Sequence, residues 1–169
     1  MIEIERTFLV KKIPDLTEAK KIEMVDVYFP ENSDHPTLRL RSRGNKYEMT
    51  KKEPTSDGDA SKQKEHTIPL IEEEFISLSR IPGKCVEKTR HVLEINGRTA
   101  EIDVFHGALS GLVLADFEFE KEEEKNAFEM PEFCLVDVTQ ELFLAGGMLC
   151  GRSYSDIEEE LKKFGYEKL

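Results

Sequence analysis

Residues 98–120, RTAEIDVFHGALSGLVLADFEFE, decide the fold because apolar and acidic side chains alternate through both halves of the stretch. A period of two is the pattern of a β-strand that has two different faces. The short connection between the halves predicts two neighbouring antiparallel strands, 98–106 and 112–120, with their acids on the same face. These acids are Glu101 and Asp103 in the first strand, and Asp116, Glu118 and Glu120 in the second.

The same alternation recurs along the rest of the chain. It predicts further strands at 2–10, 20–29, 37–43, 46–52, 62–70 and 86–94. Residues 53–61 are polar, contain Pro, Gly and Ser, and are expected to form a loop. Helical patterns occupy 71–80, 139–150 and 155–164. For the last helix, Ser155 and Glu158 form a candidate capping box, and Gly165 follows its expected end.

Composition narrows the class of protein. The 169 residues include 24 Lys+Arg and 35 Asp+Glu, a net charge of −11, together with ten Phe and four Tyr. The length fits one domain over residues 1–169. No apolar run approaches the roughly 20 residues of a membrane helix, and no secretory pattern opens the chain. The three cysteines form no C-x-x-C pair, so we expect a cytoplasmic protein without a disulfide scaffold. The net acidity argues against broad nucleic-acid coating.

Charges on the polar faces are sorted by strand. Glu3 and Glu5 share one face, and so do the acids of 98–106 and 112–120. Three arginines share the polar face of 37–43, and Lys88 and Arg90 share that of 86–94. A polar face usually meets water, which is the plainest interpretation of each strand alone. A solvated face more often mixes signs, however, because like charges side by side are unfavourable.

Sorted charges suit a site between two clusters of opposite sign. Carboxylate clusters favour hard divalent cations, and rows of Arg and Lys favour phosphates. Both clusters face one cavity if the strands close into a barrel with the charged faces inside. We therefore expect an α+β protein with an eight-stranded antiparallel β-barrel, or tunnel. Its interior would be charged, and helices would surround it and cover the outward apolar faces.

Ordered motifs over about 150 residues resemble the CYTH, or triphosphate tunnel metalloenzyme, superfamily. EIERTFLV resembles the opening strand with its E-x-E-x-K hallmark. The later motifs follow in the order of the family: RLRSR, YEMTKK, KEHTIPL, KTRHVLEI, AEIDVFHGALSGLVLADFEFE and DVT at 137–139.

The resemblance implies an eight-stranded antiparallel tunnel and metal-dependent hydrolysis of inorganic, thiamine or nucleoside triphosphate, with Mg²⁺ or Mn²⁺ as cofactor. Some members act on RNA 5′-triphosphate ends, the one nucleic acid that we retain as a partner. A membrane partner is not expected. By position, the implied metal ligands are Glu3, Glu5, Glu118, Asp116 and Glu65. The implied substrate-binding residues are Arg39, Arg41, Lys52, Lys88 and Arg90, and the implied catalytic residues are Glu101 and Asp103.

One position departs from the hallmark, because its Lys falls on Thr7. Arg6 cannot replace that Lys, since neighbouring residues of a regular strand point to opposite faces. A hydroxyl positions water but supplies no positive charge. Two alternatives stay open: an adenylate cyclase that converts ATP to cyclic AMP, and, because of Thr7, a non-catalytic module that binds nucleotide or polyphosphate.

Overall fold

The computed structural model describes residues 2–56 and 58–169. These residues form nine strands: β1 (Ile2–Val10), β2 (Lys20–Phe29), β3 (Leu38–Arg43), β4 (Lys46–Pro54), β5 (Lys62–Leu70), β6 (Lys84–Ile95), β7 (Arg98–Phe105), β8 (Val113–Phe119) and β9 (Cys134–Asp137). The helices are α1 (Glu72–Leu78), α2 (Glu122–Ala127), α3 (Gly146–Leu149) and α4 (Tyr154–Lys163), with short 3₁₀ turns at Gly107–Leu109 and Leu142–Leu144. No helix within this described part is long and apolar enough to cross a membrane.

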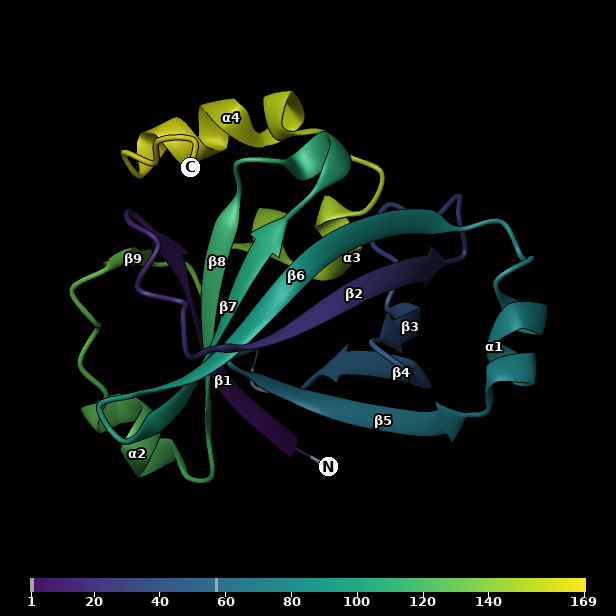
Figure 1. Cartoon of the computed structure of the whole chain (residues 1–169), viewed down its shortest axis with the longest axis horizontal. Helices are drawn as coiled ribbons and strands as arrows, with labels where there is room; N and C mark the ends of the chain where they lie inside the picture. The colour runs from purple at the N-terminus through teal and green to yellow at the C-terminus, as the bar shows by residue number, and fades with distance from the viewer. Residues whose placement is uncertain (1, 57) are drawn as a thin grey trace.

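Eight antiparallel strands close into a barrel in the order β5-β4-β3-β2-β6-β7-β8-β1, and β1 returns to β5. β1 divides its free edge between two partners. Its first half, Ile2–Ile4, pairs with β5, and its second half, Phe8–Val10, pairs with β9. Figure 1 shows the long β6 and β2 crossing above β5, with β1 entering between β5 and β8. The predicted eight-stranded tunnel is confirmed.

Alternation sends the charged faces inward and the apolar faces outward. On β7 and β8, the outward Ile102, Ala115 and Phe117 are completely buried beneath covering segments. One apolar cluster lies around Phe8 and Phe117, with Phe128 stacked against both rings. The barrel is thus inverted relative to a small barrel that has an apolar core.

A second apolar cluster closes one end of the barrel. Leu9, the last inward residue of β1, and Leu114, the first inward residue of β8, pack with Leu144 and Leu149 from the segment after β9. Ile157 and Leu161 of α4 belong to the same cluster, so the amphipathic face of α4 covers this end. Figure 1 places α4 above β7 and β8, and α3 next to β6.

The prediction of one helix over 139–150 was wrong. Residues 142–144 form a 3₁₀ turn, Ala145 is extended with ψ 140°, and α3 is only a single turn. The break lies at Ala145, and Gly146 and Gly147 follow it at positions where a side chain would collide with its neighbours. A Cβ on Gly146 would overlap the Tyr28 hydroxyl, and a Cβ on Gly147 would overlap the Pro36 carbonyl oxygen.

The capping box expected at Ser155 and Glu158 was also wrong. Ser153 caps α4, and its backbone N–H and hydroxyl both donate to Asp156 Oδ2, at 2.7 and 2.8 Å. Gly165, just after the helix, has φ +72°, as expected of a residue that ends a helix. β9 and α2 were not expected, and the loop predicted at 53–61 begins after Pro54.

The close approach at Gly146 gives a stability prediction. Gly146→Ala should lower the free energy of unfolding by about 1–3 kcal/mol, because the new methyl group overlaps the Tyr28 hydroxyl. The same substitution in a Tyr28→Phe background should cost clearly less, since the overlapping oxygen is gone. Urea unfolding of the four proteins measures both costs. An equal cost in both backgrounds would contradict this packing.

Candidate active site

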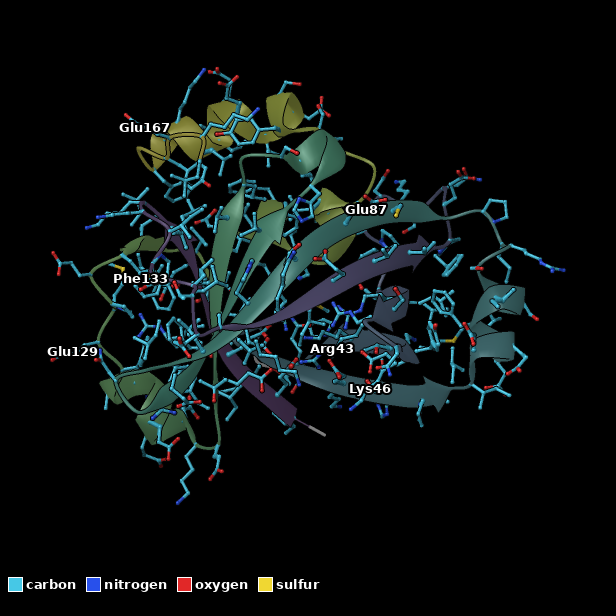
Figure 2. The ribbon with its side chains drawn as sticks, in the orientation of Figure 1. Arg43, Lys46, Glu87, Glu129, Phe133 and Glu167 are labelled. Carbon is cyan, nitrogen blue, oxygen red and sulfur yellow. The ribbon has the colours of Figure 1, made fainter. Side chains whose placement is uncertain are left out.

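The barrel encloses a cavity of about 690 Å³. All twelve residues that the sequence assigned to a site line it, from seven different strands. Figure 2 shows the side chains around the ribbons and labels Arg43, a further lining residue that lies among the barrel strands. The assigned residues that the fold brings together are Glu3, Glu5, Arg39, Arg41, Lys52, Glu65, Lys88, Arg90, Glu101, Asp103, Asp116 and Glu118.

Arg90 anchors the β6–β7–β8 side of the cavity. Its Nε and Nη2 donate to the two oxygens of Asp103, each at 2.7 Å, and Nη1 donates to Glu101. Lys88 also donates to Asp103. Burial alone would raise the pKa of Asp103, but Lys88 and Arg90 hold it below its usual range. Asp103 therefore stays charged and keeps two cations pointing into the tunnel.

Asp26 on β2 performs the same task for the β3 arginines, and sequence reasoning missed it. Arg41 binds Asp26 through two parallel hydrogen bonds, Nε to Oδ1 at 2.6 Å and Nη2 to Oδ2 at 2.7 Å. Arg39 lies 4.0 Å from the same carboxylate. Burial opposes ionisation, yet these arginines lower the pKa of Asp26 to about 2. The signal in the sequence was an acid that alternates with the apolar Val25 and Val27.

Lys52 of β4 lies close to three acids, two at the start of β1 and one on β5. Its ammonium group contacts Glu3 directly and lies 3.8 Å from Glu5 and 3.4 Å from Glu65. Burial lowers the pKa of Lys52, but Glu5 and Glu3 outweigh it and raise the value to about 12. One cation thus serves three carboxylates.

Glu5 remains under-compensated in this arrangement. Burial raises its pKa to about 7, and Asp116, Glu3 and Glu118 add to the rise while Lys52 opposes it. The pKa of Glu118 is also raised, by burial and then by Glu101 and Glu3. Burial is the main cause of both shifts, and the neighbouring carboxylates beside β1 and β8 add to it.

Thr7 lies in this acidic region. Its hydroxyl donates to Asp116 Oδ1 at 2.7 Å, and its backbone N–H donates to Thr139 Oγ1 at 3.0 Å. Arg6 points to the outer face, as predicted, where it binds Asp137 at 2.6 Å. Thr7 therefore has no neighbouring cation from Arg6 to replace a lysine. Burial, together with the charge of Asp103, raises the pKa of Asp116.

The donor set fits a divalent cation by its chemistry. Eleven acids and six bases line the described part of the cavity, and hard cations prefer such carboxylate oxygens. Within residues 2–56 and 58–169, no three His, Cys, Asp or Glu side chains already converge closely enough to hold a metal ion. Glu3 and Glu5 instead face Lys52. Binding a cation would require these carboxylates to turn from their lysine partner.

A closed antiparallel barrel with acids and bases facing one cavity defines a tunnel protein of the kind that binds polyanions together with cations. The family model of the CYTH domain matches residues 1–130. The chain belongs to the CYTH domain family.

The relatives to which the chain is similar agree with this assignment. The chain is 38% identical to an inorganic triphosphatase of Nitrosomonas europaea over 143 residues. The matched region is 83% of this chain and 91% of that protein. It is 29% identical to an inorganic triphosphatase of Acetivibrio thermocellus, over 93% of this chain and 98% of that protein. A crystal structure titled as an inorganic triphosphatase superimposes with a TM-score of 0.64 and 32% identity, over 88% of this chain and 93% of the other.

The raised pKa of Glu5 gives a pH prediction for the metal-free protein. An unfolded glutamate titrates near pH 4.3, so between about pH 4.3 and 7 the folded state binds more protons than the unfolded state. Stability should therefore fall as the pH rises through this window. Glu5→Gln removes that loss and should be more stable than the parent by about 1–3 kcal/mol at pH 8 in EDTA.

Urea unfolding from pH 4 to 8 measures the difference between parent and variant. At pH 4, where Glu5 of the folded parent is protonated, the difference in the free energy of unfolding should shrink to that between a neutral Glu and a Gln. Glu129→Gln, at an exposed position after α2, is the matched control and should track the parent throughout. A Glu5→Gln variant that is less stable than the parent at pH 8 would contradict the charge excess around Glu5.

Proposed function

We propose that this protein is a metal-dependent hydrolase of triphosphate, with inorganic triphosphate as its substrate and Mg²⁺ or Mn²⁺ as its cofactor. The observation that carries the proposal is the single 690 Å³ cavity in which a row of arginines and lysines faces an under-compensated acid cluster. The inorganic triphosphatases to which the chain is similar support the choice of substrate.

Basic residues on β3, β4 and β6 would bind the triphosphate. Arg39 offers a direct indication, because its Nε is buried and has no hydrogen-bond partner in the described part of the chain. A buried donor without an acceptor is costly, and a phosphate oxygen would satisfy it. Asp26 and Asp103 hold the other guanidinium groups in place before the substrate arrives. The full binding set in this proposal is Arg39, Arg41, Lys52, Lys88 and Arg90.

Acids on the opposite side would hold the metal. Glu3, Glu5 and Glu118 are the proposed principal ligands, with Asp116 and Glu65 at the edge of the same cluster. A bound divalent cation supplies charge neutralisation for the triphosphate and lowers the pKa of a bound water. A tunnel with more acids than bases needs such a cation to accept a polyanion, because the acids would otherwise repel it.

Glu101 and Asp103 would contribute to the attack of water in different ways. Both oxygens of Asp103 are occupied by Arg90 and Lys88, so its part is to hold those cations against the transferring phosphoryl group. Glu101 accepts a hydrogen bond from Arg90 at Oε2, while its Oε1 lies 3.7 Å from Arg43 Nη2. We assign Glu101 the orientation of the attacking water. The arginines and lysines stabilise charge that develops on the leaving phosphate.

The proposed place of action is the cytoplasm. Cys85, Cys134 and Cys150 all lie in the described residues and carry free thiols. Free thiols are typical of a reducing compartment.

Phosphate release from tripolyphosphate is the first test of the activity. Release should require Mg²⁺ or Mn²⁺ and cease in EDTA. Glu5→Gln should lose most metal-dependent turnover while it keeps the fold, because the variant loses a charged ligand. ATP is assayed in parallel for free phosphate and cyclic AMP. Cyclic AMP without phosphate release would favour the cyclase, and tight binding without turnover would favour a binding module.

Asp26 gives a second test of the site. Asp26→Asn should raise the KM for tripolyphosphate roughly 10- to 100-fold, a loss of about 1.5–3 kcal/mol, with a smaller change in kcat. The physical reason is that Arg41 loses the paired carboxylate that holds it towards the cavity. Glu23→Gln, on the outer face of the same strand, is the control and should leave KM unchanged. A thermal melt confirms folding of both variants. An unchanged KM in Asp26→Asn would contradict this role.

A further inference from the structure

The outer face of β5 and the neighbouring α1 expose apolar side chains, although the outward Leu40 of β3 is completely buried. The two buried apolar clusters contain outward residues of β1, β7 and β8. Among the described residues, none from β3, β4, β5 or α1 belongs to either cluster. On this side α1 is the covering helix, and none of its residues is buried. In Figure 1, α1 lies beside the ends of β3, β4 and β5, far from α2, α3 and α4.

Exposed isoleucines concentrate on this side. Nine large apolar side chains are exposed in the described chain, and four of them fall between residues 68 and 81. Ile68 on β5 is 60% exposed and lies opposite Met49 of β4 on the outer face. Met49 also lines an apolar cavity of about 370 Å³ between α1 and the barrel, together with Leu78 and Ile81. Met49 thus connects Ile68 with an apolar cavity at the end of α1. The four exposed residues are Ile68, Ile71, Ile76 and Ile81.

Charges flank this apolar surface in a definite order along β4 and β5. At one end, Tyr47 stacks on Phe75 of α1, with ring centroids 4.6 Å apart, and α1 begins with the exposed acids Glu72, Glu73 and Glu74. The pair Met49–Ile68 follows in the centre. At the other end come the cross-strand pairs Lys51–His66 and Glu53–Lys64, whose basic members are exposed. Lys51 also forms an ion pair with Glu53, at 3.1 Å, so the bases exceed the acid at this end by the charge of Lys64.

An acidic end, an apolar centre and a basic end make a surface that complements itself. A two-fold axis through Met49 and Ile68 would place the acidic end of one copy on the basic end of another. This match is notable in a chain of net charge −11, because two copies otherwise repel each other. We propose that a second copy of this chain covers the face formed by β4, β5 and α1, so that the protein is a two-fold symmetric dimer. This inference does not depend on the proposed enzyme activity.

Sedimentation velocity over a range of concentrations at low salt tests the proposal. The parent should sediment with twice the 19.5 kDa chain mass. Ile68→Lys should raise the dimer dissociation constant at least about tenfold, because it places an unpaired charge at the centre of the interface. Met130→Lys is the matched control, since Met130 is 44% exposed and lies elsewhere, after α2. It should leave the constant unchanged.

Charge reversal tests the two-fold arrangement itself. Lys64→Glu and Glu73→Lys should each weaken the dimer, because each makes both symmetric contacts repulsive. A mixture of the two variants should recover a dimer, since a mixed pair regains an opposite charge at both contacts. A concentration of about 100 µM is high enough to populate even a weak dimer. A parent that stays monomeric at this concentration in low salt would overturn the proposal, and the face would then be left to a different protein. So would a dimer unaffected by Ile68→Lys, or single variants that stay apart when mixed.

Discussion

Ion pairing inside the barrel is the constraint on which the rest of the structure depends. Charged groups in a protein interior are costly unless they are paired and hydrogen-bonded. Each inward cation here has a carboxylate partner: Arg90 has Asp103, Arg41 has Asp26, and Lys52 has Glu3. The pairs allow the charged faces to point inward, and they also hold the cations in the orientation that a polyanion needs. Stability and binding thus rest on the same contacts.

Ion pairing is incomplete in one region of the tunnel, and this region makes one side of the tunnel acidic. Around Glu5, Asp116 and Glu118 the acids exceed their cations, and the pKa values of all three are raised. Thr7 contributes a hydroxyl there and no charge. An added cation relieves the excess and joins the anion to the acidic wall. The proposed metal is therefore needed to balance the charge of the tunnel.

Because the charged faces point into the barrel, the apolar side chains lie on its outside and must be covered there. The plug of Leu9, Leu114, Leu144 and Leu149 and the cover provided by α4 satisfy it on one side. Gly146, which leaves room for Tyr28, allows the segment after β9 to approach the barrel closely. On the other side, α1 is too short to bury the outward residues of β4 and β5. The open face is a consequence of the same inversion that creates the site.

Alternation and the sorting of charges were sufficient to predict the eight barrel strands and the inward direction of Glu101, Asp103, Asp116 and Glu118. The prediction was wrong for Glu120, which lies just beyond the end of β8 and is exposed. They did not reveal Asp26, because the apolar Val25, Val27 and Phe29 of the same strand indicate only an ordinary half-buried strand. β9 has four residues and forms by pairing with the second half of β1, which local patterns do not encode. The need for glycine at position 146 comes from its contact with Tyr28, more than a hundred residues earlier. Such long-range contacts are invisible in local periodicity.

The central claim is that one tunnel holds a metal on its acidic wall and a triphosphate on its basic wall. A crystal structure with Mn²⁺ and a non-hydrolysable triphosphate analogue tests it most directly, because Mn²⁺ scatters anomalously. The account predicts an anomalous peak among Glu3, Glu5 and Glu118, with phosphate density reaching Arg39 and Arg41. A peak and phosphate density outside the barrel, with the Lys52–Glu3 pair intact, would contradict it.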